Sequence, residues 1–316
     1  MKREKKLEII GKIALLLTAV VWGSSFIVLK NALADFGNGH FTFLVLALRF
    51  GIASLILFFS IIKKLRYIDK GVVLHGVILG AILFGAYGIQ TVGLKYTTAS
   101  KNAFLTVIYC VLVPFLSWLI LKKKPKLSHY VAGALCITGI AFVAVLGKNE
   151  AHGSNEWIGD LLSAVSGLFY ALQIIFISKY AESDDAMILL FFEIATVAVL
   201  CFLTTFTFEF SKHHAEISFS FEIVWKILYL AVFATCFSQF TQMIAQKYVA
   251  PFSVALLLSL EGVFSVVFEL ISGASAPSVF IWIGFVFIFL SQIVSEIDPL
   301  ELIKQRREKN KIENNS

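Results

Sequence analysis

The chain has 316 residues, of which 58% are hydrophobic and 15% are charged, and its formal net charge is +6. Soluble domains are close to half apolar and a quarter charged, so this composition excludes a soluble domain and predicts an integral membrane protein. The basic residues lie between apolar runs rather than along one face, and we therefore expect no nucleic-acid partner.

Ten apolar runs are long enough to cross a lipid bilayer, for which a helix needs about 20 residues. In chain order, the predicted spans are 13–31, 41–62, 71–94, 98–121, 128–147, 157–178, 186–208, 223–246, 250–271 and 277–296. The connections are short apart from 209–222, so no soluble domain is inserted between the spans. We therefore predict an all-α integral membrane protein with ten transmembrane helices, a cytoplasmic N-terminal segment at 1–12 and a cytoplasmic tail at 297–316.

Lysine and arginine residues indicate how these spans are oriented. If the N-terminus is cytoplasmic, 20 of the 27 basic residues fall on the cytoplasmic side, 6 fall outside and Arg49 lies within a span. This bias follows the positive-inside rule and predicts that both termini are cytoplasmic. A competing interpretation of the first span is a secretory signal cleaved after 32–34, but the length of the span and its counterpart in the second half argue against cleavage.

Two stretches of the chain repeat each other at a distance of 152 residues. KYTTASKNAFLTVIY begins at Lys95, and KYVAPFSVALLLSLE begins at Lys247. Span one aligns with span six at a slightly different offset, with Trp22-Gly23 over Tyr170-Ala171. The two halves, 13–147 and 157–296, then contain five spans each. Because five is odd, the second half enters the membrane upside down, which predicts a 5+5 inverted repeat with a pathway between the halves.

Three ionisable residues lie deep within predicted spans, where a charge is costly and marks either a functional site or an internal ion pair. Arg49 lies in span two and aligns with Glu193 in span seven, whereas Glu261 in span nine aligns with Tyr109. Arg49 would bind a substrate carboxylate or pair with a carboxylate of the protein. Glu261 or Glu193 would bind a substrate amine or a coupling proton. An internal ion pair that fixes helix packing is the alternative, and the partner of Arg49 stays open.

Spans three and eight each carry a polar pair three residues apart, which places both members on one helix face. The pairs are Tyr87 with Gln90 and Gln239 with Gln242. They line a cavity or make hydrogen bonds between helices, and the two interpretations stay open. The complete set of cavity-lining candidates is Trp22, Ser25, Arg49, Tyr87, Gln90, Tyr109, Tyr170, Gln173, Glu193, Gln239, Gln242 and Glu261.

The sequence carries no sign of enzymatic or metal chemistry. All four cysteines, Cys110, Cys136, Cys201 and Cys236, fall in apolar spans without a CxxC pair, so we expect small core residues. His213-His214 lies between spans seven and eight and is interpreted as a solvated pair. HExxH, GxSxG and P-loop motifs are absent from the sequence, and we predict no catalytic residue, no metal and no cofactor.

Four sequence elements resemble the EamA-type branch of the drug/metabolite transporter superfamily over about residues 10–296. They are ALLLTAVVWGSSF in span one, GDLLSAVSGLFYALQ in span six, GLKYTTASKNAFL and AQKYVAPFSVALL. The resemblance implies a 5+5 inverted-repeat bundle with a central cavity, peripheral spans five and ten, and export of small metabolites, often amino acids or their derivatives. Three departures weaken any transfer of substrate identity: Lys122-Lys123-Lys124-Pro125 after span four, Glu261-Gly262 in place of Glu-Pro, and Tyr170-Ala171 in place of Trp-Ala.

We therefore expect a secondary transporter of the plasma membrane that exports a small-molecule substrate by alternating access. Coupling to protons and a homodimer stay open; Gly76 and Gly80 form a GxxxG motif that indicates close helix packing rather than a dimer face. An intramembrane enzyme or lipid-handling protein is the alternative. A channel is less compatible with the sequence, because the segment beginning at Thr91 lacks the aromatic residue and the final glycine of a potassium-filter motif, and because duplicated halves favour rocking over a fixed pore.

Overall fold

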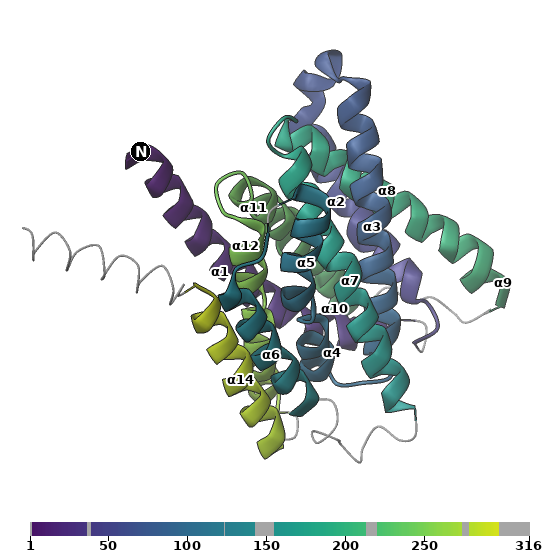
Figure 1. Cartoon of the computed structure of the whole chain (residues 1–316). Helices are drawn as coiled ribbons and strands as arrows, with labels where there is room; N and C mark the ends of the chain where they lie inside the picture. The colour runs from purple at the N-terminus through teal and green to yellow at the C-terminus, as the bar shows by residue number, and fades with distance from the viewer. Residues whose placement is uncertain are drawn as a thin grey trace, which may run out of the picture.

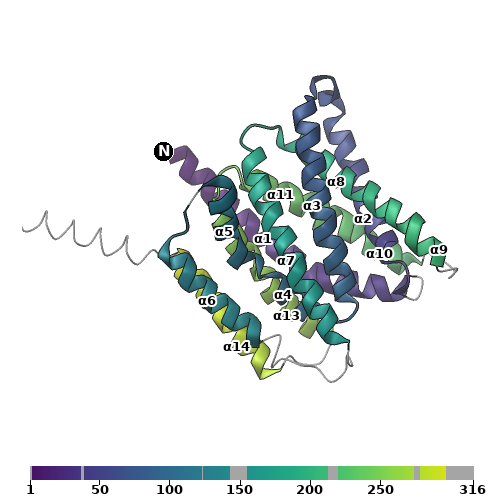
Figure 2. The ribbon, with the colours of Figure 1, turned by 45° about the vertical axis from the view of Figure 1, so that its right-hand side comes forward.

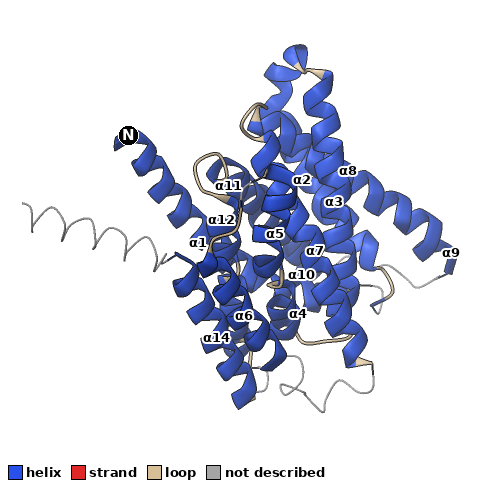
Figure 3. Ribbon diagram, in the orientation of Figure 1, coloured by secondary structure: helices blue, strands red, loops and turns tan. Residues whose placement is uncertain are grey.

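The computed structural model describes residues 2–36, 39–122, 124–142, 155–212, 220–273 and 278–296. Within these ranges every regular element is a helix (Figure 3). Eight helical segments are long and apolar enough to cross a membrane, and they coincide with predicted spans one to four and six to nine. Two shorter apolar helices, Leu127–Ala141 and Val279–Ser291, fall in predicted spans five and ten. The chain is therefore an all-helical membrane protein.

The helices follow one another in the order shown by the colours of Figure 1. They are α1 (Lys2–Asp35), α2 (Thr42–Ile61), α3 (Lys70–Leu94), α4 (Ala99–Thr106), α5 (Tyr109–Leu121), α6 (Leu127–Ala141), α7 (Glu156–Tyr180), α8 (Ala186–Thr204), α9 (Phe210–Lys212), α10 (Phe221–Tyr229), α11 (Ser238–Ala245), α12 (Pro251–Leu258), α13 (Leu260–Ile271) and α14 (Val279–Glu296). A 3₁₀ segment spans Ile62–Tyr67, and π-helical segments span Thr205–Glu209 and Leu230–Phe237. Helix α1 begins eleven residues before the predicted first span, because its lysines and glutamates are good helix formers.

Three predicted spans are interrupted away from their ends. Span four is divided into α4 and α5, span nine into α12 and α13, and span eight contains the π-helical segment Leu230–Phe237. Helix α4 ends at Thr106 and α12 ends at Leu258, so these two breaks lie 152 residues apart, as the repeat requires. Apolar composition alone does not distinguish a straight helix from a broken one, since both bury the same side chains.

The most closely packed helices surround the centre of the bundle. Helix α3 packs against α7 and α8, α2 packs against α8, and α1 packs against α13 and α11. A Cβ atom added to Gly80 of α3 would lie 2.5 Å from the Glu193 carbonyl oxygen, and one added to Gly76 would lie 2.5 Å from the Phe192 Cβ. The GxxxG motif therefore serves close packing of α3 on α8 within one chain, as predicted.

Helices α6 and α14 lie side by side at one edge of the bundle (Figure 2). Gly139 of α6 permits this contact, because a Cβ at that position would lie 2.6 Å from the Gly284 carbonyl oxygen of α14. This arrangement agrees with the peripheral position expected for spans five and ten. The remaining helices surround the polar residues discussed below.

Candidate functional site

A narrow cavity lies at the centre of the bundle. It is lined by Trp22, Ser25, Phe26, Leu29, Arg49, Tyr87, Gln90, Tyr109, Tyr170, Gln173, Ile174, Gln242, Leu258 and Glu261. Ten of the twelve residues proposed from the sequence are in this set, and they come from α1, α2, α3, α5, α7, α11 and α13. The other two, Glu193 and Gln239, are absent from the lining and lie behind Gln173. In this conformation the cavity has room for little more than ordered water.

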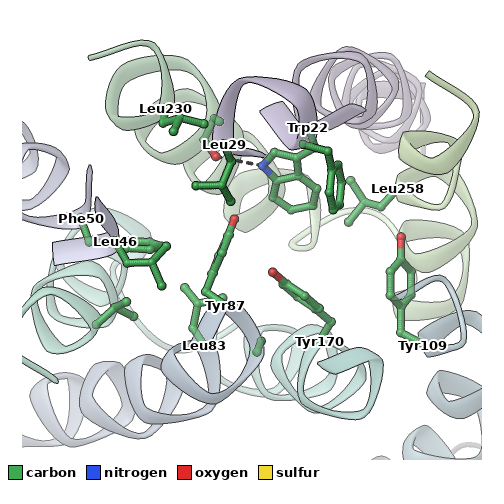
Figure 4. Close-up of a cluster of buried hydrophobic side chains, with 14 of the residues drawn as sticks. Trp22, Leu29, Leu46, Phe50, Leu83, Tyr87, Tyr109, Tyr170, Leu230 and Leu258 are labelled. Carbon is green, nitrogen blue, oxygen red and sulfur yellow. Dashed lines mark hydrogen bonds between the residues drawn. The ribbon is translucent and has the colours of Figure 1, made fainter. Parts of the chain in front are cut away.

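Aromatic side chains form much of the cavity wall (Figure 4). The ring centroids of Tyr87 and Tyr170 are 5.6 Å apart at an interplanar angle of 77°, and those of Tyr109 and Tyr170 are 6.5 Å apart at 63°. The Trp22 indole Nε1 donates a hydrogen bond of 2.9 Å to the Ala234 carbonyl oxygen. Such edge-to-face rings present both apolar surface and π faces, which suit an apolar or a cationic group of a solute.

Two polar side chains of the wall already have their hydrogen-bond partners inside the protein. The Gln90 amide donates to Thr106 Oγ1 at 3.0 Å and accepts from the Tyr170 hydroxyl at 2.7 Å. The Ser25 hydroxyl donates to the Trp22 carbonyl oxygen at 2.8 Å. In this conformation Gln90 and Ser25 therefore shape the cavity wall, while their polar groups bond within the protein rather than to a solute.

Arg49 is 1% exposed and is the only arginine or lysine in the lining described above. Its Nε donates to Thr235 Oγ1 at 2.7 Å, and its Nη2 donates to the Ala234 carbonyl oxygen at 3.2 Å and to the Tyr87 hydroxyl at 3.3 Å. Thr235 and Ala234 belong to the π-helical segment Leu230–Phe237. A π-helical turn is wider than an α-helical turn, and it changes which backbone carbonyl groups accept hydrogen bonds within the helix. The guanidinium is thus held in place without a carboxylate.

Glu261 is 5% exposed and lies at the start of α13. Its Oε1 accepts a hydrogen bond of 3.2 Å from the Tyr109 hydroxyl. Helix α1 packs directly behind it, since a Cβ added to Gly23 would lie 3.0 Å from the Glu261 carbonyl oxygen. The side chain has no cationic partner among the described residues, so its carboxyl group is available to the cavity.

Glu193 is fully buried and belongs to a separate cluster of amide side chains. The Gln173 Nε2 donates to Glu193 Oε1 at 2.9 Å and to Gln239 Oε1 at 3.2 Å. The Gln242 Nε2 donates in turn to Gln173 Oε1 at 3.1 Å. Gln173 and Gln242 therefore connect Glu193 to the cavity, although Glu193 itself does not line it.

The internal ion pair considered for Arg49 is not formed. Within the described residues no carboxylate oxygen lies within 4.0 Å of its guanidinium nitrogens, and neither Glu193 nor Glu261 has a basic partner at that distance. A buried charge without a partner is costly, so three such groups close to one cavity favour binding of an external charged or protonated group.

A buried ionic cluster that the sequence analysis did not identify joins the start of α4 to α7. Lys101, at the start of α4, is fully buried, and its Nζ lies 2.9 Å from Glu156 Oε1 and 2.9 Å from Asp160 Oδ2. Asp160 also accepts from the Thr97 hydroxyl at 2.9 Å. The sequence does contain a sign of this cluster: a lysine lies in the apolar span four and an aspartate in the apolar span six. Opposite charges at similar depth in the membrane can form an ion pair.

Helices α1 and α13 join the same end of the bundle. The Lys30 Nζ of α1 donates to the Thr97 carbonyl oxygen at 2.6 Å, and Glu269 of α13 accepts from the Ser100 backbone N–H at 3.1 Å. The connection between α3 and α4 is therefore held by α1, α7 and α13 together.

The remaining sequence predictions concern cysteines, histidines and metals. Cys110, Cys136 and Cys201 are buried and Cys236 is half-buried, and all four are free, as expected of core residues. Across the part of the chain that the structure describes, no group of three or more His, Cys, Asp or Glu side chains is arranged to hold a metal ion. His213-His214 lies outside the described residues.

Comparisons with known proteins identify the family. The sequence matches the EamA-like transporter family twice, over residues 9–145 and 157–295. A protein of Archaeoglobus fulgidus named "Uncharacterized transporter" is 33% identical over 81% of this chain and 76% of its own length, and a second protein of that organism with the same name is 26% identical over 85% and 91%. "Uncharacterized transporter YvbV" of Bacillus subtilis is 25% identical over 54% of each chain.

A solved crystal structure shares the fold. It superposes with a TM-score of 0.66 over 93% of this chain and 97% of the other, at 17% sequence identity. The two matched segments together cover more than half of this sequence, and the likeness to the first archaeal relative extends over four fifths of it. The chain belongs to the EamA-like transporter family.

Proposed function

We propose that the protein is a secondary transporter that exports small metabolites, such as amino acids or related amphipathic solutes, across the plasma membrane. The observation that carries this proposal is a central cavity lined by Arg49 and Glu261, neither of which has an oppositely charged partner among the described residues. A guanidinium binds a carboxylate, and a carboxylate binds an amine, so the two groups together suit a zwitterion. Family membership points to transport rather than to an enzymatic reaction.

The ten candidate residues that line the cavity take different parts in this proposal. Arg49 and Glu261 would bind the charged ends of the solute, and the rings of Tyr87, Tyr109 and Tyr170 would contact its apolar part. The remaining cavity residues, Trp22, Ser25, Gln90, Gln173 and Gln242, would complete the wall. Solute entry requires the cavity to widen, which is the role of alternating access.

The movement would use two five-helix halves, 13–147 and 157–296, arranged as an inverted repeat with both termini cytoplasmic. Helix breaks 152 residues apart in the two halves support this arrangement. Close contacts at the breaks also support it: Gly23 of α1 packs on α13, and Gly167 of α7 packs on α4 and α5, where an added Cβ would lie 2.6 Å from the Thr106 carbonyl oxygen. Two similar halves can exchange conformations and so open the cavity to each side in turn.

Counterflow in liposomes tests the proposal. Purified protein is reconstituted, the vesicles are loaded with one unlabelled amino acid, and uptake of its labelled form is followed for a panel of amino acids. A carrier gives transient, saturable accumulation for at least one member, whereas a channel gives linear flux without accumulation. Arg49→Gln should abolish the signal, and Lys70→Gln, which changes an exposed lysine at the start of α3, should retain it. Linear flux or no flux across the panel contradicts the proposal.

A further inference from the structure

Glu193 and Gln239 lie outside the cavity lining, in a buried cluster that has unused hydrogen-bonding capacity. Glu193 and Gln239 are fully buried, and Gln173 and Gln242 are each 1% exposed. Within this cluster, Glu193 Oε2, Gln239 Nε2 and Gln242 Oε1 have no hydrogen-bond partner. Buried polar atoms are nearly always paired, so three unpaired atoms in one cluster indicate that something binds there.

The charge of Glu193 is not balanced by its surroundings. Helix α8 packs against α2, α3, α11 and the segment Thr205–Glu209, and Gln173 reaches the carboxylate from α7. The charged and titratable groups of these elements are Arg49, Lys70, His75, Tyr87, Glu156, Asp160, Tyr170, Lys179, Tyr180, Cys201 and Glu209. Three of these groups have their contacts elsewhere: Arg49 donates to Thr235, His75 pairs with Asp184, and Glu209 accepts from two backbone N–H groups of α2. The Tyr87 hydroxyl lies next to Gln239 of the cluster and carries no charge that could balance Glu193.

Glu193 has no path to water in this conformation. The backbone of α8 at this residue is packed on α3, because a Cβ added to Gly80 would lie 2.5 Å from the Glu193 carbonyl oxygen. An isolated carboxylate at this depth costs several kcal/mol, and the cost is removed when a proton binds. A protonated carboxyl group also becomes a donor, and Gln242 Oε1 in the same cluster is an acceptor without a donor.

A metal cation fits the cluster less well than a proton. Sodium requires several oxygen ligands directed at one point. Here the Gln173 Nε2, an N–H donor, lies between Glu193 Oε1 and Gln239 Oε1 and uses both oxygens as acceptors. The position that a cation would need is thus occupied by the amide of Gln173.

We propose that Glu193 is a proton-binding site separate from the substrate cavity, and that Gln173 transmits its protonation state to the cavity wall. The hydrogen bond from the Gln173 Nε2 to Glu193 Oε1 suits an ionised carboxylate. A proton taken up from water through the opened cavity converts the carboxylate to a carboxylic acid, which can donate to an amide oxygen instead. Gln173 and Gln242, which line the cavity, then exchange donor and acceptor roles toward the solute. As a route of energy coupling, this inference rests on the proposed transport function; the proton site itself does not.

Infrared difference spectra between acidic and alkaline pH test the site without a transport assay. The wild-type protein in detergent should show a carboxylic C=O band that is lost in Glu193→Gln. Glu209→Gln is the matched control, since Glu209 is buried directly after the predicted span that holds Glu193 but has both oxygens bonded to backbone N–H groups. Glu209→Gln should retain the Glu193 band. If Glu193→Gln cannot be purified, Glu193→Asp should shift the band and Glu209→Asp should not. A spectrum unchanged by the Glu193 substitution overturns the proposal.

The pH dependence of counterflow tests the coupling. Wild-type transport should change by up to about tenfold per pH unit over the range in which Glu193 titrates, as one bound proton allows. Glu193→Gln should transport with a flat profile, while Glu209→Gln should follow the wild type. An unchanged profile in Glu193→Gln, or a requirement for sodium at constant pH, overturns the coupling role. Absence of wild-type counterflow would instead contradict the proposed transport function and leave the infrared result valid.

Discussion

The Tyr109 hydroxyl donates a 3.2 Å hydrogen bond to Glu261 Oε1, and the two residues are 152 residues apart in the sequence. This separation is also the period of the repeat, so residues at equivalent positions of the two halves touch each other. Residues exchanged by a two-fold axis can touch only where they lie close to that axis. The contact therefore agrees with the proposed inverted repeat and places the centre of the cavity beside α5 and α13.

Tyr109→Phe should weaken solute binding by removing the donor to Glu261. Loss of one hydrogen bond to a buried charged group costs about 1–3 kcal/mol, which corresponds to roughly 5- to 150-fold in affinity. The half-saturating solute concentration in counterflow measures the effect. Tyr130→Phe, on the exposed face of α6, is the matched control and should behave as wild type. Equal behaviour of the two variants would show that the Tyr109 contact has no part in binding.

Arg49→Lys should weaken solute binding, although it keeps the positive charge. The guanidinium donates through Nε and Nη2 to Thr235, Ala234 and Tyr87 in a fixed planar arrangement that an ammonium cannot reproduce. We expect at least about a tenfold loss of affinity for a carboxylate-bearing solute. The thermal shift caused by an amino acid, compared with that caused by the corresponding amine without a carboxylate, measures this specificity. A lysine variant with wild-type affinity for both would contradict the role of Arg49.

Lys101→Met should destabilise the protein strongly, because it leaves Glu156 and Asp160 without their buried cation. Removing one partner of a buried ionic group costs about 3–5 kcal/mol. Adding Glu156→Gln and Asp160→Asn to the same chain should recover most of this loss, since no buried charge is then left unpaired. Thermal unfolding in detergent measures both variants. A triple variant as unstable as Lys101→Met would show that packing, and not charge, holds this end of the bundle.

Gly80→Ala should separate α3 from α8. The added Cβ would lie 2.5 Å from both the Glu193 carbonyl oxygen and the Thr196 Cβ. The backbones of α3 and α8 would have to move apart to relieve this clash. Overpacking of this kind costs about 1–3 kcal/mol. Gly133→Ala of α6 is the control, because its Cβ would lie 3.7 Å from Val111 at ordinary contact distance. Replacing glycine by alanine there should leave the melting temperature unchanged or raise it.

Asp185 provides a pH-dependent contribution to stability outside the membrane spans. It caps α8 by accepting from the backbone N–H groups of Met187 and Ile188, and it pairs with Lys64 at 2.5 Å. Partial burial opposes ionisation, but the hydrogen bonds from Lys64 and the backbone outweigh it and hold the pKa of Asp185 below its usual value.

The contribution of Asp185 should therefore be present above about pH 4, the usual pKa of the unfolded residue, and should be lost as the pH falls through the lower folded value. Asp185→Ala should cost about 1 kcal/mol near neutral pH, as loss of an N-cap does, and progressively less in acid. Thermal unfolding of both proteins across this pH range measures the difference. A difference that grows in acid would contradict the assignment.

The cavity residues could be proposed from the sequence because polar groups are conspicuous in apolar runs. Arg49 and Glu261 each interrupt a hydrophobic span, and the polar pairs at Tyr87 and Gln239 occur at matching places of a repeat. Such residues stand out because placing a charged group inside a bilayer costs free energy, so a charge is retained there only where it binds a ligand or pairs with another group. The resemblance to the EamA family rested on the order of short elements, and the family match confirmed it.

The structure changed the interpretation of several positions. Glu193 aligns with Arg49 but does not line the cavity, because the rotation of α8 is set by its packing on Gly76 and Gly80. Gly23 of α1 and Gly167 of α7 each pack on the broken span of the other half, but at positions of the two spans that are not equivalent.

Sequence alone thus determined that the chain is a helical membrane protein of two similar halves with charged residues between them, because hydropathy and repetition are properties of residue order. Only the tertiary structure decided where spans four, eight and nine are interrupted, which face of α8 meets Gln173, and how Lys101 finds two carboxylates of α7. Those features depend on hydrogen-bond register and on contacts between segments far apart in the chain, and equally apolar sequences satisfy many such arrangements.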